Sequence, residues 1–186
     1  MLRIFVFMGC LIWSSLGLTQ THPRYQVDMI VFTHLQPATP SSVQTTSDLH
    51  LVPNMTHAIP LKNDHQTTAL PYHTLPISAS QLRNEYWALN RKPDYQILFH
   101  YTWLQPSNNQ KAIALPQSNG HDWNVEGTLR IRQSNYYLFD TDLLFSAPNN
   151  TQPAFVFSKK QRLKPEVVYY LDHPQAGMLI KIHRVA

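Results

Sequence analysis

The sequence predicts an α+β protein built on a mainly antiparallel β-sheet of about six to seven strands, with one helix and a long irregular insertion. Three observations predict this class. Segments with alternating apolar and polar residues recur along the second half of the chain, short turns separate them, and one stretch has the apolar spacing of a helix. Consecutive strands joined by short turns favour antiparallel pairing, because parallel neighbours need a longer crossover connection.

The first strand is predicted over residues 24–33, RYQVDMIVFT. A period of two places four side chains on one face, namely Tyr25, Val27, Met29 and Val31. On the other face, Gln26 and Asp28 are followed by Ile30 and Phe32. We therefore expect the strand to begin with one polar face and to end buried on both.

Residues 36–77 are predicted to form the long irregular insertion. This segment is rich in Thr, Pro, Ser, His and Asn and lacks a sustained period, which is typical of connecting segments. Its short apolar piece Ala58-Ile59-Pro60-Leu61 can still dock on the core. The ten histidines of the chain are scattered, and several lie in or beside this insertion, which favours solvated coil over a metal site.

The helix is predicted to begin at Ser78 and to end before Pro93. Ser78 and Gln81 have the spacing of a capping box, which would satisfy free backbone donors of the first turn. The apolar face of the helix consists of Leu82, Tyr86 and Leu89.

Four further strands are predicted in addition to the first strand and to the two arms of a hairpin over residues 125–145. They cover residues 94–104, 153–163, 166–171 and 177–185. The strand after the helix is aromatic, and its period places one set of side chains on one face: Tyr95, Ile97, Phe99, Tyr101 and Trp103.

The stretch Asp172-His173-Pro174 lies between the last two strands. We interpret it as a hairpin corner, in which Pro174 fixes φ and Asp172 accepts backbone N–H bonds. On this interpretation Asp172→Ala lowers the free energy of unfolding by about 1 kcal/mol. His173 is expected to be a partly exposed turn residue rather than a ligand.

A hairpin is predicted from arms over residues 125–132 and 136–145. A three-residue loop, 133–135, would set Leu129 opposite Phe139 and give one clean apolar face. The alternative two-residue turn would set Leu129 opposite Asp140, so we favour the three-residue loop. The other face of the hairpin then carries Arg130, Arg132, Tyr136, Asp140 and Asp142.

The N-terminus has the layout of a secretory signal peptide over residues 1–19. Arg3 precedes an apolar run, and cleavage is expected near Gly17; an uncleaved N-terminal anchor is the alternative. Residues 20–186 are predicted to form a single domain. Cys10 is the only cysteine and would leave with the signal, which excludes a disulfide scaffold, a thiolate metal site and a cysteine nucleophile from the mature chain.

The charge balance limits the classes of partner. The net charge is +4 and charged residues make up 14% of the chain, without a dense basic run. Nucleic-acid binding normally needs such a run, whereas a mildly positive surface suits an anionic polymer or an acidic partner. No catalytic or phosphate-binding motif is present in the sequence. We predict no cofactor and no metal, and membrane contact only through the signal peptide during export.

Four blocks of sequence carry a family resemblance. Tyr25 opens the pattern Tyr-x-Val-acid-x-Ile-Val-Phe, and Tyr95 opens Tyr-x-Ile-Leu-x-His-x-x-Trp-x-Gln-Pro. Asp140 opens an acid-x-Asp-Leu run, and a basic run containing Lys160 and Arg162 precedes the closing block Tyr-Leu-Asp-His-Pro, which a glycine follows. In order and content these blocks resemble the CsiV family of periplasmic peptidoglycan-binding proteins, over essentially the whole chain except residues 36–77.

This resemblance implies a small, non-enzymatic protein of the Gram-negative periplasm that binds peptidoglycan. It also implies a role in supporting a bifunctional penicillin-binding protein, a cell-wall synthase, through its outer-membrane lipoprotein activator. A protein-interaction adaptor in the envelope that does not touch glycan is the alternative function.

Peptidoglycan offers sugar rings, carboxylates and amines, and the charged face of the hairpin offers complementary groups. The candidate ligand-binding residues are Arg130, Arg132, Tyr136, Asp140, Asp142, Trp103 and Arg162. Trp103 is included because an exposed ring is plausible at a strand end. The competing interpretation of this face is a solvated surface with cross-strand charge pairs.

A weak wall hydrolase is the remaining hypothesis. Asp140 and Asp142 lie two residues apart on a strand, so their side chains share a face at about 7 Å, near the carboxylate separation of inverting glycosidases. A hydrolase also needs a cleft and one carboxyl that burial keeps protonated. Nothing in the sequence indicates either feature, so we predict no enzymatic activity.

Overall fold

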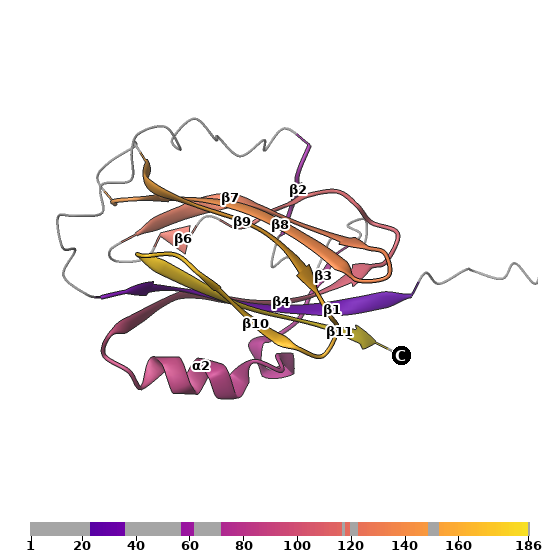
Figure 1. Cartoon of the computed structure of the whole chain (residues 1–186), viewed down its shortest axis with the longest axis horizontal. Coiled ribbons are helices and arrows are strands. Elements are labelled where there is room, and N and C mark those ends of the chain that lie inside the picture. The colour runs from indigo at the N-terminus through magenta and orange to yellow at the C-terminus, as the bar shows by residue number, and fades with distance from the viewer. Residues whose placement is uncertain are drawn as a thin grey trace, which may run out of the picture.

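The computed structural model describes residues 23–35, 57–61, 72–116, 118–119, 123–148 and 153–185. In this part of the chain two β-sheets stack face to face, and one short helix covers the outer side of the first sheet (Figure 1). The predicted mainly antiparallel pairing and the single helix are confirmed, but the described part of the protein is mainly β rather than α+β, because α2 is only eight residues long. The prediction of one sheet is wrong, because a two-residue period defines the faces of a strand but not the sheet that it joins.

The first sheet has the strand order β10–β11–β1–β4–β3, and all of its neighbouring strands are antiparallel. The bounds are Val168–Asp172 for β10, Ala176–Val185 for β11, Arg24–His34 for β1, Tyr95–Pro106 for β4 and His73–Thr74 for β3. β1 lies in the middle of this order and is buried from Tyr25 to Thr33. We expected the outer face of β1 to begin with the polar residues Gln26 and Asp28 and to be buried only at its far end. Instead this face is buried along its whole length.

The second sheet has the strand order β2–β5–β7–β8–β9, with β6 paired to β7 beside this path. The bounds are Ile59–Pro60 for β2, Ile113–Ala114 for β5, Ser118–Asn119 for β6, Asn124–Gln133 for β7, Tyr137–Ser146 for β8 and Pro153–Leu163 for β9. β2 and β5 are parallel, and the other pairs are antiparallel. The long strands β7, β8 and β9 form the body of this layer.

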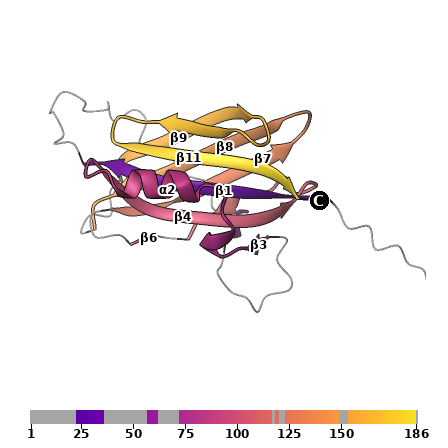
Figure 2. The same ribbon diagram turned by 90° about the horizontal axis from the view of Figure 1, so that it is seen from below.

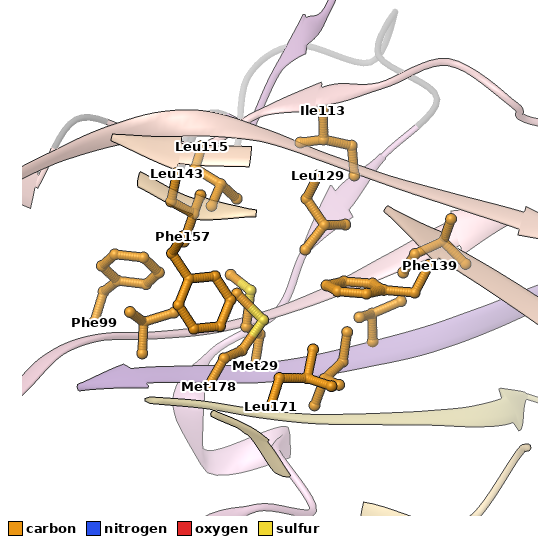
Figure 3. Close-up of a cluster of buried hydrophobic side chains, with 14 of the residues drawn as sticks. Met29, Phe99, Ile113, Leu115, Leu129, Phe139, Leu143, Phe157, Leu171 and Met178 are labelled. Carbon is orange, nitrogen blue, oxygen red and sulfur yellow. The ribbon is translucent and has the colours of Figure 1, made fainter. Parts of the chain in front are cut away.

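The hydrophobic core fills the space between the two sheets, as Figure 3 shows. Met29 and Met178 of the first sheet meet Leu129, Phe139 and Phe157 of the second. The predicted inner face of β1 is confirmed, since Tyr25, Val27, Met29 and Val31 all belong to this core. The docking of the short apolar piece is also confirmed, because Leu61 is only 2% exposed within the same cluster.

Helix α2 (Arg83–Asn90) lies across the outer face of the first sheet (Figure 2). Its predicted apolar face is confirmed: Leu82, Tyr86 and Leu89 pack with Ile30 and Phe32 of β1. The predicted start at Ser78 is wrong. The 3₁₀ turn η3 (Ile77–Ala79) precedes the helix, and Ser80 Oγ accepts the Leu82 N–H at 3.1 Å. A serine two residues later thus takes the place of the expected capping box.

The hairpin of β7 and β8 pairs Leu129 with Thr141, Arg130 with Asp140, and Ile131 with Phe139. The expected register, with Leu129 opposite Phe139, is wrong by two residues, and the loop comprises residues 134–136. A slip of two residues leaves every side chain on its predicted face. The predicted apolar and charged faces of the hairpin are therefore confirmed, although the partners along the ladder differ.

The aromatic strand β4 does not keep one alternating face. Its ladder with β1 shifts between Val31 and Phe32, which pair with Phe99 and Ile97. Such a bulge exchanges the faces of the strand on either side of it. Tyr95 and Ile97 therefore pack under α2, while Phe99 and Trp103 belong to the core between the sheets.

The corner between β10 and β11 is a turn, as predicted, but His173 is not exposed. It is 7% exposed and stacks on Phe155 with 4.8 Å between the ring centroids. His173 and Ala176 exchange two backbone hydrogen bonds, and His173 Nδ1 accepts the Gln175 N–H at 3.2 Å. Asp172 instead accepts the Tyr170 hydroxyl at 2.5 Å. The turn is thus held by His173, whereas we expected Asp172 to hold it.

Two predictions fall outside the described residues: the signal peptide over residues 1–19 and most of the insertion over residues 36–77. Among the helices that the structure does describe, none is long and apolar enough to cross a bilayer.

Candidate functional site

The outer face of the second sheet carries charged and polar side chains in rows that run across β7, β8 and β9. One row consists of Arg130, Asp140 and Lys160, the next of Thr128, Asp142 and Ser158, and the third of Arg132, Leu138 and Arg162. Directly opposite residues on neighbouring strands lie about 5 Å apart at Cβ. A cation, an anion and a cation therefore alternate across the sheet in the first row.

An open groove of about 790 Å³ lies on this face. Its charged lining consists of the cations Lys111, Arg130, Arg132 and Lys160 and the carboxylates Asp140 and Asp142. The remaining lining residues are His57, Ala58, Gln110, Ala112 and Thr128. Four cations against two carboxylates leave this lining with a charge of +2, histidine being counted as neutral.

Hydrogen bonds hold several of these side chains in fixed positions. Arg132 Nη2 lies 2.7 Å from Asp140 Oδ2, an ion pair in which the side chains are 35% and 25% exposed. The Arg130 Nε–H donates to the Gln110 carbonyl at 2.7 Å, and the Ser158 hydroxyl donates to Asp142 Oδ1 at 2.6 Å. The site is therefore oriented in advance rather than formed by free side chains.

The sheet beneath the groove explains this rigidity. Leu129, Ile131 and Phe139 alternate with the charged residues and are at most 1% exposed. Gly127 lets β7 approach β8 closely: a Cβ on this residue would collide with the Asp142 carbonyl oxygen and approach Leu143 Cα to 2.8 Å. The backbone that carries Asp142 is thus fixed by a close approach that only glycine permits.

Four of the predicted site residues, Arg130, Arg132, Asp140 and Asp142, meet in this groove. Tyr136 and Arg162 lie beyond it, at the loop end of the same face, where the Arg162 guanidinium lies 4.8 Å from the Tyr136 ring centroid. The Arg162 guanidinium thus lies over the Tyr136 ring in a cation–π contact.

Trp103 lies elsewhere. The expected exposed ring is wrong, since Trp103 is 0% exposed in the core between the sheets. Its Nε1–H donates to Gln105 Oε1 at 3.3 Å. A buried indole that has a hydrogen-bond partner is a core residue, so we leave Trp103 out of the site.

Sequence reasoning missed the part of the groove that comes from the segment between β4 and β5. Gln110, Lys111 and Ala112 line one side of it. No residue pattern there gives a signal, because only the pairing of β5 with β7 brings this segment beside Arg130.

A second polar cluster lies on the outer face of the first sheet and is closed. Asp28 is 0% exposed; its Oδ1 accepts Gln26 Nε2–H at 2.9 Å and its Oδ2 accepts the Gln81 N–H at 3.0 Å. His183 Nε2 lies 3.4 Å from Oδ2, which is longer than a tight hydrogen bond. Burial raises the pKa of the Asp28 carboxyl, but the nearby His183, the hydrogen bonds from Gln26 and Gln81 and the neighbouring Thr102 outweigh this effect. They hold the pKa below its ordinary value.

His100 completes this closed cluster, with its Nε2 2.8 Å from Ser80 Oγ. Burial lowers the pKa of His100, and the nearby Asp28 opposes this shift. A cavity of about 300 Å³ adjoins it, lined mainly by residues 74–77 and 100–102. The contacts of Asp28 and His100 tie β1, β4 and β11 to the segment that leads into α2, so we assign this cluster to the fold.

The open groove presents cations and carboxylates that can bind a ligand of complementary charge. Neither Asp140 nor Asp142 is buried in apolar surroundings, the setting that lets a carboxyl act as a general acid. Within the part of the chain that the structure describes, no three histidine, cysteine, aspartate or glutamate side chains come together as a metal-binding group.

Comparison with known proteins gives one match. The family model described as "Peptidoglycan-binding protein, CsiV" matches residues 3–185 of the chain. No curated protein and no solved structure matches it. The matched residues include every strand of both sheets. The chain therefore belongs to the CsiV family of peptidoglycan-binding proteins.

Proposed function

We propose that this protein binds peptidoglycan in the periplasm without chemical turnover, and that the groove on the outer face of the second sheet is its binding site. The groove itself is the observation that carries the proposal, because it gathers four cations and two carboxylates on one open surface. Membership of the family supports the class of ligand.

The fixed geometry suits an anionic polymer that also carries amines. Guanidinium and ammonium groups bind carboxylates through charge-assisted hydrogen bonds, and carboxylates bind amines. Because Arg130 and Arg132 are held by Gln110 and Asp140, little side-chain entropy is lost when a ligand binds to them.

The experiment is co-sedimentation of the mature protein with isolated sacculi, at low and at moderate salt. Wild-type protein is expected to pellet at both, since binding by fixed groups survives screening better than diffuse attraction does. Arg130→Ala with Arg132→Ala should weaken the apparent affinity about tenfold or more, the loss expected for at least one charge-assisted contact. Its thermal transition should stay close to that of wild type.

The matched control is Arg83→Ala with Arg91→Ala, which removes the same charge from exposed positions at and just after α2. Equal binding by wild type and both double variants would show that the groove is the wrong site. Pelleting only at low salt would reduce the proposal to nonspecific attraction, and no pelleting would favour the adaptor function. Release of soluble muropeptides from the sacculi would indicate a hydrolase.

The wider role that we propose is support of cell-wall synthesis, through the lipoprotein activator of a bifunctional penicillin-binding protein. It rests on the family resemblance of the closing block around Asp172-His173-Pro174 and the other blocks of sequence. A pull-down of the purified activator by the mature protein, with and without soluble peptidoglycan fragments, tests this role directly.

A further inference from the structure

We propose that the groove recognises the charged stem peptide of peptidoglycan and not its glycan strand. This inference rests on the proposed function, since it specifies which part of the polymer occupies that same site.

The groove lacks the surface that sugar rings need. Sugars are bound by flat, exposed aromatic rings, whose apolar faces meet the C–H surface of the ring. Among the described residues that line the groove, none is phenylalanine, tyrosine or tryptophan. Tyr137 and Phe139 of β8 are buried in the core, and Tyr136 outside the groove is already stacked with Arg162. The exposed ring of Trp87 belongs to α2, on the opposite side of the molecule.

The charges that remain available favour a ligand with more carboxylates than amines. Arg132 and Asp140 neutralise each other in their ion pair. Lys111, Arg130 and Lys160 form no ion pair with any described residue, and the last two lie in the row across β7 and β9. Among the described residues, the hydrogen-bond partner of Asp142 is the neutral Ser158 hydroxyl. The groove thus presents three unneutralised cations and one carboxylate.

This pattern matches the stem peptide. In intact peptidoglycan the lactyl carboxyl of the sugar is consumed in the amide bond to the peptide, so the acetylated glycan strand carries no ionic groups. The peptide carries free carboxylates in excess of its free amine. Electrostatic complementarity between a binding site and its ligand chiefly determines specificity and orientation. In peptidoglycan only the stem peptide carries charges that the groove can bind.

The dimensions agree with a short peptide segment. The volume of about 790 Å³ lies within the range of small-ligand pockets, about 300–1,000 Å³. Asp142 lies one row away from Arg130 and Lys160, a separation of about 7 Å along the strand. A ligand carboxylate bound by Arg130 or by Lys160, which flank Asp140 in their row, therefore leaves Asp142 for an amine on the same peptide.

The test is competition in the sacculus co-sedimentation. Soluble stem peptides are added as one competitor, and soluble glycan strands as the other, at equal molar concentrations of repeat unit. The glycan strands are freed of peptides by an amidase, and the lactyl carboxyls that this exposes are converted to methyl amides so that the strands stay uncharged. Stem peptides are expected to displace the protein from sacculi at a concentration at least tenfold lower than glycan strands. Displacement by glycan strands alone, or by neither competitor, overturns the inference while the proposed function stands. Failure to bind sacculi at all overturns the proposed function itself.

A second arm tests the role of Asp142. Acetylation of the free amines of the sacculi should weaken wild-type binding and should leave binding by Asp142→Asn unchanged, because this variant has already lost the amine contact. Asparagine keeps an acceptor for the Ser158 hydroxyl, so the fold of β8 is retained. Equal weakening of both proteins by acetylation would contradict the assignment of Asp142.

Discussion

Asp28 on β1 and Asp140 on β8 both point away from the core between the sheets, one from each layer of the sandwich. Asp28 is fully buried beneath the segment that leads into α2, where two hydrogen-bond donors and His183 surround it. Asp140 borders an open groove and, among the described residues, forms one ion pair, with Arg132. The same residue type on the same kind of element therefore occupies a closed site in one sheet and an open site in the other.

The difference shows that the surroundings of a charged side chain, rather than its residue type, decide whether it stabilises the fold or is available to bind a ligand. A carboxylate whose oxygens are occupied by internal donors has no capacity left for a ligand. A carboxylate such as Asp140, whose one partner is itself partly exposed, retains that capacity. Its removal costs little stability because ion pairs open to solvent contribute about 0–1 kcal/mol. The buried polar cluster of the first sheet holds the segment that leads into α2, whereas the outer face of the second sheet remains accessible to a ligand.

The largest expected effect comes from emptying the closed site. Asp28→Ala leaves buried donors of Gln26 and Gln81 without an acceptor and should lower the free energy of unfolding by about 3–5 kcal/mol. Asp140→Ala should lower it by about 1 kcal/mol or less. Urea unfolding measures both. Comparable losses in the free energy of unfolding for the two variants would contradict the distinction between the closed site and the open site. If Asp28→Ala does not fold, Asp28→Asn is measured instead, because asparagine keeps the side-chain volume and one acceptor oxygen.

The sequence was sufficient to predict most strands and their faces, because a period of two is a local property. β9 was predicted with its observed bounds, and the inner face of β1 is the predicted one. The register of β7 and β8 could not be obtained in this way. Registers that differ by two residues bury the same side chains, so the choice depends on loop geometry and on packing against the other sheet.

The charged face of the candidate site was predictable for the same reason, and the groove was not. Arg130, Arg132, Asp140 and Asp142 alternate with buried residues, so their common face follows from the period. Lys111 reaches the groove only through a distant pairing of β5 with β7. The binding role of all of these residues stays a prediction until it is measured.

The misplacement of Trp103 has a different physical reason. A strand end at Gln105-Pro106 made an exposed ring plausible, but the central strand β1 runs alongside this end and the second sheet covers it. Burial at a strand end depends on the layer above, which one strand cannot reveal.

The next effect concerns the backbone behind the open face. Gly127→Ala places a Cβ against the Asp142 carbonyl and should lower the free energy of unfolding by about 1–3 kcal/mol, the usual cost of overpacking. It should also weaken sacculus binding, because β8 must move where it carries Asp142. Glu126→Ala, an exposed neighbour on β7, is the control and should stay within about 0.5 kcal/mol of wild type. Wild-type stability of the glycine variant would refute the close approach.

The pH dependence of stability is expected to come from two buried histidines. Burial lowers the pKa of His100 and of His173; Lys159 and His34 add to the shift at His173, whereas Asp172 opposes it. A histidine with a depressed folded-state pKa binds fewer protons in the folded than in the unfolded state as pH falls below about 6.5, so stability is lost on acidification.

Urea midpoints at pH 7.5 and pH 5.5 measure this loss. His100→Gln and His173→Gln together should flatten the difference between the two midpoints, whatever they do to the absolute stability. The lowered pKa of Asp28 acts in a separate window: its stabilising contribution is complete above about pH 4 and is lost only as pH falls further. A wild-type midpoint that does not change between pH 7.5 and 5.5 would contradict the role of the histidines.

The smallest effect returns to the corner between β10 and β11. Because Asp172 is exposed and accepts only the Tyr170 hydroxyl among the contacts described above, Asp172→Ala should cost about 0.5 kcal/mol, less than a turn-capping role would imply. Tyr170→Phe removes the same hydrogen bond from its other end, so a double-mutant cycle should assign nearly all of the aspartate effect to this pair. An additive cycle with a larger aspartate loss would instead restore Asp172 as the residue that holds the turn. The backbone and ring contacts of His173 would then contribute less to the turn than Asp172 does, although Asp172 is exposed.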